Sequence, residues 1–254
     1  MSAPDPAAPE GKEQSFLSHL IELRTRLLRA VAAVFVVFLA LVPFANRLYS
    51  QLAQPLISRL PEGSSMVAID VITPFFTPLK MAFFSAIFIT VPFLLYQAWA
   101  FVAPGLYRHE RRLAVPLLAS ATLLFYVGCA FAYFVVLPLV FRFLAASAPE
   151  GVKMMTDISH YLDFVLVLFF AFGLCFEVPV ATVILVILGV VTPETLRKSR
   201  GYVIVGAFAI AAVITPPDAL SQILLAVPMV ILFEVGLVAA RAVARRREAE
   251  EAKP

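Results

Sequence analysis

Long apolar runs alternate with short polar segments along most of the chain. A helix needs about 20 mostly apolar residues to cross a hydrocarbon core of about 30 Å. The six runs that we interpret as membrane-spanning helices are residues 27–45, 74–101, 113–145, 160–190, 201–215 and 219–240. The pattern therefore predicts an all-α membrane protein with six transmembrane helices.

The predicted spans differ in length, which affects the shape of the bundle. At 1.5 Å per residue, residues 201–215 make about 22 Å of helix and residues 160–190 make about 46 Å. The short span has to thin the bilayer or lie beside partner helices, whereas the long one has to tilt or kink. Four spans also contain a proline that favours a bend, namely Pro92, Pro138, Pro179 and Pro228. We therefore expect an irregular, concave bundle.

The composition agrees with a membrane location. The chain is 61% hydrophobic and 15% charged, with a mean hydropathy of +0.92, whereas a soluble domain is about 45–50% apolar and about 25% charged. A single soluble core and a disordered chain are both excluded. Fifteen of the 20 Lys and Arg residues lie before or at the start of the first span, after the last span, or in the segments 102–112 and 191–200. The positive-inside rule then predicts that both termini are cytoplasmic.

The chain divides into a membrane domain and two tails. We expect a flexible cytoplasmic tail over 1–14, a membrane domain over 15–240 and a basic cytoplasmic tail over 241–254. The first residues lack the features of a cleaved signal peptide. Residues 15–30 show apolar and polar positions at helical spacing, which predicts an amphipathic helix at the cytoplasmic interface that continues into the first span.

Two acidic side chains are predicted at the cytoplasmic face. Glu22 lies four residues before Arg26, so a surface ion pair is one interpretation of both residues. Glu110 lies among three arginines and could simply neutralise them. His109 and Glu110 begin a zinc-protease-like motif, but position 113 is Leu, so a metal site lacks its second ligand. No cofactor or metal site is predicted, and the two cysteines, Cys129 and Cys175, are expected to be buried thiols.

Glu177 lies near the middle of an apolar stretch. A carboxylate at the bilayer centre costs at least about 2.5–3.5 kcal/mol on insertion scales, so it should face protein, a water-filled cavity or a ligand. A purely structural interpretation is a neutral glutamate that bonds between helices near the bend at Pro179. Asp218, by contrast, is expected to cap the helix that follows an outer turn.

Several motifs in this order and spacing closely resemble the TatC family, the multispanning subunits of the twin-arginine protein translocase. They are HLIELR (19–24), PFFTP (74–78), YQAWAFVAPGLY (96–107), HERR (109–112), FYVG (125–128), FAYF (131–134), FEVP (176–179) and TPPD (215–218). The resemblance covers about residues 15–240. It implies a receptor, not an enzyme, in a bacterial cytoplasmic membrane. Such a receptor binds the twin-arginine signal peptides of folded proteins and is powered by the proton-motive force.

The resemblance also implies partners and residue roles. The partners would be the single-span proteins TatA and TatB, other TatC copies and membrane lipids, with no nucleic acid. Guanidinium groups bind carboxylates bidentately, so acidic residues suit a peptide with two arginines. By resemblance, the signal peptide contacts Glu22, Glu110, Phe101 and Arg24; Glu177 lies on the concave face; Thr215 and Gln222 contact TatA or TatB; and Pro55 and Asp218 belong to the outer side.

The residues also allow a comparison with two other functional classes. A proton-coupled secondary transporter would use Glu177 as a proton relay and Lys80 as its counter-charge, but paired half-sites and internal repeats are missing. An intramembrane enzyme is disfavoured because the sequence lacks nucleophile motifs.

Overall fold

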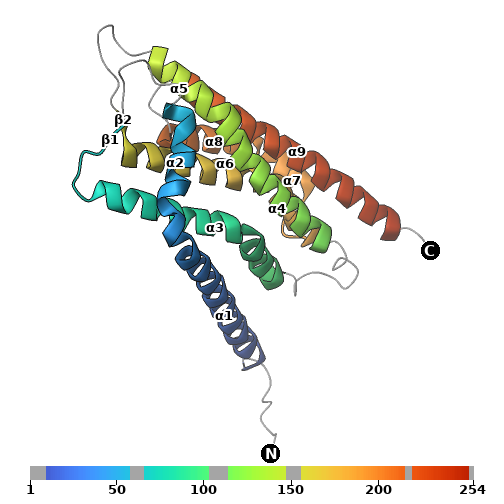
Figure 1. Cartoon of the computed structure of the whole chain (residues 1–254). Helices are drawn as coiled ribbons and strands as arrows, with labels where there is room; N and C mark the ends of the chain where they lie inside the picture. Colours follow the sequence, from blue (N-terminus) through green and yellow to red (C-terminus); the bar gives the residue numbers. More distant parts are fainter. Residues whose placement is uncertain (1–9, 58–65, 103–113, 147–155, 215–218, 252–254) are drawn as a thin grey trace, which may run out of the picture.

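The computed structural model describes residues 10–57, 66–102, 114–146, 156–214 and 219–251, and these are almost entirely helical (Figure 1). The elements are α1 (Glu10–Leu41), the 3₁₀ turn η1 (Val42–Phe44), α2 (Ala45–Ile57), β1 (Met66–Val67), α3 (Thr73–Val102), α4 (Ala114–Phe131), the π-helical segment η4 (Ala132–Val136), α5 (Leu137–Ala146), β2 (Thr156–Asp157), α6 (Ile158–Ile187), α7 (Pro193–Lys198), α8 (Arg200–Ile214) and α9 (Ala219–Glu251).

Five helical stretches of the described residues are long and apolar enough to cross a membrane, and α8 is a sixth, shorter apolar helix. This confirms the predicted all-α architecture. The five stretches are Leu20–Gln54, Thr73–Phe101, Val115–Arg142, Ile158–Ile187 and Gln222–Arg245. The predicted third span is α4, η4 and α5 together, which form one continuous rod in Figure 1.

Helix boundaries differ from the prediction for local reasons. The predicted first span ends at residue 45, but α1 ends at Leu41 because Pro43 lies in the 3₁₀ turn that follows. At the other end, the amphipathic helix continues into the first span as predicted, but α1 begins at Glu10 and so includes residues 10–14 of the segment predicted to be a flexible tail. The predicted fourth span ends at residue 190, whereas α6 ends at Ile187 because Gly189 adopts a φ of 71°.

The core of the bundle lies along α6, which packs against α3, α4 and α9. Phe172 of α6 and Leu225 of α9 are completely buried in it. Phe88 of α3 contributes a second layer, since its ring lies 5.8 Å from that of Phe125 in α4 and 5.1 Å from that of Phe170 in α6. Aromatic contacts therefore join α3, α4 and α6, and the hydroxyl of Tyr126 in α4 adds a 2.8 Å hydrogen bond to the carbonyl of Phe88.

Two glycines let helices approach closely. A Cβ at Gly128 of α4 would lie 2.5 Å from the carbonyl oxygen of Phe172 in α6. A Cβ at Gly236 of α9 would collide with the hydroxyl of Thr182 and lie 2.8 Å from Cα of Pro179, both in α6. Small residues at such crossings are the usual way in which helices pack inside a membrane. Both glycines fix the position of the middle of α6, which carries Glu177.

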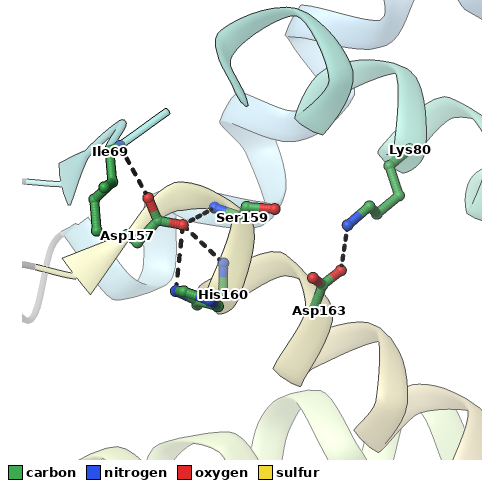
Figure 2. A network of polar contacts seen from close by, with 6 residues as sticks. All are labelled: Ile69, Lys80, Asp157, Ser159, His160 and Asp163. Atoms are coloured by element: carbon green, nitrogen blue, oxygen red, sulfur yellow. Dashed lines mark hydrogen bonds and ion pairs between the residues drawn. The ribbon is translucent and has the colours of Figure 1, made fainter. Parts of the chain in front are cut away.

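One carboxylate organises the end of the bundle at which α3 and α6 begin (Figure 2). β1 and β2 pair in parallel there, with Val67 opposite Asp157. Asp157 Oδ1 accepts hydrogen bonds from the N–H groups of Ser159 at 2.8 Å and His160 at 3.0 Å, which caps α6. Its Oδ2 accepts a 3.2 Å bond from the N–H of Ile69. These N–H donors, that of His160 first, lower the pKa of Asp157 from its usual 3.8.

Further polar contacts join the helices at this end. Lys80 Nζ of α3 forms an ion pair with Asp163 Oδ1 of α6 at 2.6 Å (Figure 2). The hydroxyl of Tyr161 in α6 donates a 3.2 Å hydrogen bond to the carbonyl of Leu52 in α2. The starts of α3 and α6 and the body of α2 are thereby held together.

Substituting Gly236→Ala should lower the free energy of unfolding by about 1–3 kcal/mol, because the new methyl group overpacks the crossing of α9 with α6. Thermal unfolding in detergent measures this. Gly206→Ala in α8 is the matched control, since nothing lies within 4 Å of its Cβ position. Equal melting temperatures for the two variants would show that the crossing is looser than described.

Replacing Asp157 by Ala should lower the free energy of unfolding by about 1–3 kcal/mol, because three backbone N–H groups lose their acceptor. The pH dependence follows from the lowered pKa of Asp157. The stabilisation is complete above the unfolded value of 3.8 and is lost as the pH falls through the lower folded value. Asp157→Asn should therefore remove part of the acid sensitivity of the wild-type protein. Identical melting curves of Asp157→Asn and wild type between pH 5 and pH 3 would contradict this.

Candidate functional site

Two contacts fix how α1 lies against α3. Near one end the rings of Phe38 and Phe83 are 5.7 Å apart, and near the other Arg26 Nη1 lies 3.5 Å from Gln97 Oε1. The number rises along α3 as it falls along α1, so the two helices are antiparallel. One turn beyond the second contact, Glu22 of α1 is level with Phe101 of α3. We call this the Glu22 end of the α1–α3 pair.

The polar face of α1 is turned toward α3. Glu22 and Arg26 are partly buried there, whereas Leu20, Leu23 and Leu27 are 44%, 44% and 61% exposed. This is the reverse of a soluble amphipathic helix, whose apolar face is buried. The first turns of α1 also extend beyond the other helices in Figure 1. The arrangement suits a helix surrounded by lipid, with its polar groups kept for contacts inside the protein.

The ion pair that the spacing of Glu22 and Arg26 suggested is present. Arg26 donates from Nε at 2.9 Å and from Nη2 at 2.5 Å, both to Glu22 Oε1. The side chains of Glu22 and Arg26 are 35% and 21% exposed. Within the residues that the structure describes, no contact engages the second oxygen, Oε2. The carboxylate is thus held on one side and open on the other.

The remaining residues of the expected signal-peptide site are placed as follows. Phe101 is partly buried in the last turn of α3. Arg24 is exposed, and two residues of helix, roughly 200°, separate it from Glu22, so it lies on the opposite face of α1. Glu110 falls in 103–113, outside the described residues. The structure therefore brings Glu22 and Phe101 to the same end and directs Arg24 elsewhere.

Glu177 lines a cavity of about 280 Å³ between α3, α4 and α6. The other lining residues are Leu95, Ala98, Trp99, Ala121, Leu174, Val180, Ala181 and Ile184. Glu177 Oε1 is buried and has no hydrogen-bond partner among the described residues. Burying an oxygen in an apolar cavity without a hydrogen bond lowers the free energy of unfolding. The structure thus gives no interhelical bond from this oxygen of the kind that a structural glutamate would make.

Lys80 and Glu234, two other charged residues of the apolar helices, have ion-pair partners different from Glu177. Lys80 contacts Asp163, as described above, and lies 15 residues before Leu95, the nearest α3 residue that lines the Glu177 cavity. This corresponds to roughly 22 Å of helix. Lys80 therefore cannot be the counter-charge of Glu177, which removes the main support for a secondary transporter. Glu234 of α9 pairs with Arg200 of α8 at 2.5 Å.

The expected partner and outer residues lie mostly beyond the described part. Thr215 and Asp218 fall in 215–218, and the side chain of Pro55 in α2 is not described. Gln222 is partly buried in the first turns of α9. Next to it is an open apolar groove of about 300 Å³ between η4 and α9, lined by Phe131, Val135, Val136, Leu139, Ile223, Leu224, Val227 and Pro228.

Sequence reasoning missed two polar residues that the structure makes prominent. Asp157 directly precedes a long apolar run, which is the position of a helix N-cap, and this signal could have identified it. Gln97 is 7% exposed and contacts Arg26, a pairing that depends on the register of α1 against α3. By contrast, the N-cap Thr192 with Pro193 at the first helical position is found where the sequence predicts it. The predicted buried thiols, Cys129 and Cys175, are free and half-buried.

Comparisons with known proteins agree with the motifs. The family model of TatC, the Sec-independent protein translocase protein, matches residues 18–228. The chain is 58% identical over 224 residues to the Sec-independent protein translocase protein TatC of Escherichia coli strain K12, covering 88% of this chain and 87% of that protein. It is 55% identical over 230 residues to the protein of the same name from Haemophilus influenzae, covering 91% and 90%.

A solved structure gives the same result. The fold matches a crystal structure of the twin arginine translocase receptor TatC with a TM-score of 0.80 and 36% identity. The match covers 89% of this chain and 99% of the other. The predicted six-helix fold and the family resemblance are therefore both confirmed.

Replacing Glu177 by Leu should raise the free energy of unfolding by about 1–3 kcal/mol, because the buried, unpartnered oxygen is replaced by an apolar group in an apolar cavity. Thermal unfolding in detergent provides the measurement. Leu174→Ala at the same cavity is the comparison variant and should be destabilising. A loss of stability in Glu177→Leu would mean that the carboxyl group has a stabilising partner.

Proposed function

The chain belongs to the TatC family of Sec-independent protein translocase proteins, and on that premise we propose that it is the subunit that recognises twin-arginine signal peptides. The peptide binds at the Glu22 end of the α1–α3 pair. The observation that carries the proposal is the half-open carboxylate of Glu22, level with Phe101 at the end of two antiparallel helices.

The chemistry of this end suits a guanidinium ligand. A carboxylate accepts two parallel N–H bonds from one guanidinium, and these charge-assisted bonds are stronger than neutral ones. The ring of Phe101 adds a flat surface on which a guanidinium can stack. Glu110, nine residues beyond Phe101, supplies the carboxylate for the second arginine of the pair. Arg24, on the opposite face of α1, acts outside this contact.

The apolar segment of the signal peptide would enter beside the arginine site. Ala98, which lines the Glu177 cavity, is three residues before Phe101 in α3 and so lies on nearly the same face. A chain whose arginines bind Glu22 and Glu110 can therefore continue along α3 toward α6. In this proposal, Glu177 attracts water into the cavity and lowers the barrier to insertion.

Orientation and partners complete the proposal. Arg108, Arg111 and Arg112 follow α3, so the Glu22 end faces the cytoplasm of a bacterial cell, as do both termini and the tails 1–14 and 241–254. The short helix α8, with Thr215 and Gln222, receives TatA or TatB, while Pro55 and Asp218 belong to the outer side, where copies of the receptor meet. Lipids of the inner membrane surround the assembly, and the proton-motive force drives transport.

Substituting Glu22→Gln should weaken binding of a signal peptide with Arg-Arg about tenfold, and the double change with Glu110→Gln should weaken it about 100-fold, because each removes a charge-assisted contact. The assay is the dissociation constant of a labelled peptide with the solubilised protein, alongside a Lys-Lys peptide. Glu194→Gln, an exposed acid in α7, is the matched control and should bind normally. Unchanged affinity in the double variant would remove both residues from the site.

A further inference from the structure

We propose that Arg26 is an internal competitor of the signal peptide, which holds the Glu22 carboxylate in the empty receptor and is displaced when the peptide binds. The inference rests on the proposed function, because it concerns the same carboxylate. It assigns a role to Arg26, a residue that does not itself bind the peptide in the proposed site.

The first argument is chemical identity. The group that contacts Glu22 in the structure is a guanidinium, the same group that a twin-arginine peptide presents. It donates from Nε and Nη2 to Oε1, at 2.9 and 2.5 Å. Within the described ranges, Arg26 is the ion-pair partner of Glu22. The empty site is therefore already occupied, in part, by a copy of its ligand's side chain.

The second argument concerns charge. Glu22 and Arg26 together carry no net charge, so an approaching arginine is attracted by the carboxylate and repelled by the guanidinium beside it. To bind bidentately, the peptide needs both oxygens, and Oε1 is the one that Arg26 uses. Full engagement of the peptide thus requires that Arg26 give up Oε1.

The third argument is that Arg26 has a second contact on α3. Its Nη1 lies 3.5 Å from Oε1 of Gln97, a side chain that is 7% exposed and therefore fixed in the helix interface. When Arg26 leaves Glu22, the amide oxygen of Gln97 can keep its guanidinium hydrogen-bonded instead of leaving it unpaired. The same contact keeps Arg26 within reach of Glu22, so it returns as the peptide leaves.

Such an exchange gives the receptor a limited affinity and rapid release. Neither the carboxylate nor the guanidinium is ever left without a partner, because each contact that breaks is replaced by another. Release of the peptide is assisted by the return of Arg26 to Glu22. Removing Arg26 should therefore slow dissociation more than it speeds association.

The test is a double-mutant cycle on the full-length protein in detergent, with a labelled Arg-Arg peptide. Arg26→Gln should bind the peptide about tenfold more tightly, mainly through slower dissociation, because the competitor is gone. In the Glu22→Gln background, the same substitution should give no gain. Arg29→Gln is the matched control: it removes an equal charge from an exposed position two turns from Glu22 and should leave affinity unchanged.

Each outcome decides one of the two proposals. If Glu22→Gln weakens binding but Arg26→Gln fails to tighten it, Arg26 supports the carboxylate and the competitor inference is wrong, while the binding site stands. If Glu22→Gln leaves binding unchanged, the binding site itself is wrong and the inference falls with it. Should Arg26→Gln not fold, Arg26→Lys serves instead. It pairs with Glu22 through a single ammonium and should tighten binding about threefold, and unchanged or weaker binding overturns the inference.

Discussion

A charge inside a bilayer has to find its partner within the protein, and the arrangement of these helices depends on that constraint. Lys80 joins α3 to α6, Arg200 and Glu234 join α8 to α9, and Arg26 links α1 to α3 through Gln97. Each pair lies at a crossing between apolar helices, where dispersion contacts alone would permit sliding. Three buried side-chain atoms have no hydrogen-bond partner among the described residues: Glu177 Oε1, which lies in an apolar cavity, the hydroxyl of Tyr49, and Nε of Arg200.

The ion pairs of the described residues differ in whether they join two helices or lie within one helix. The ion pairs of Lys80 with Asp163 and of Arg200 with Glu234 each join two helices, whereas Glu22 and Arg26 lie on the same helix and leave Glu22 Oε2 without a contact among the described residues. Glu177 of α6 lines a cavity whose α3 residues include Ala98, three residues before Phe101, on the path proposed for an extended peptide. Glu22 and the Glu177 cavity are therefore both associated with the end of α3 that carries Phe101.

Most of the helices could be predicted from the sequence, because twenty apolar residues in a row have few alternatives. The N-cap at Thr192 was equally readable, since Thr-Pro-Glu is a local signal. Contacts between helices could not be predicted from the sequence. The pairing of Lys80 with Asp163 and of Arg26 with Gln97 depends on how far one helix slides along another, which periodicity within a single helix does not contain. The role of Arg24 in the peptide site, which the family resemblance implied, stays a prediction, and its spacing from Glu22 places it on the opposite face of α1.

The π-helical segment η4 changes what the span containing it presents to its neighbours. A π turn holds one more residue than an α turn, so everything after it is rotated by roughly 100° relative to an uninterrupted α-helix. Ala132, Val136 and Val140 are buried at intervals of four residues across this segment. The face of α5 that meets the core is thus set by a single additional residue inside the membrane. The helix accommodates this additional residue in one wider turn and stays continuous.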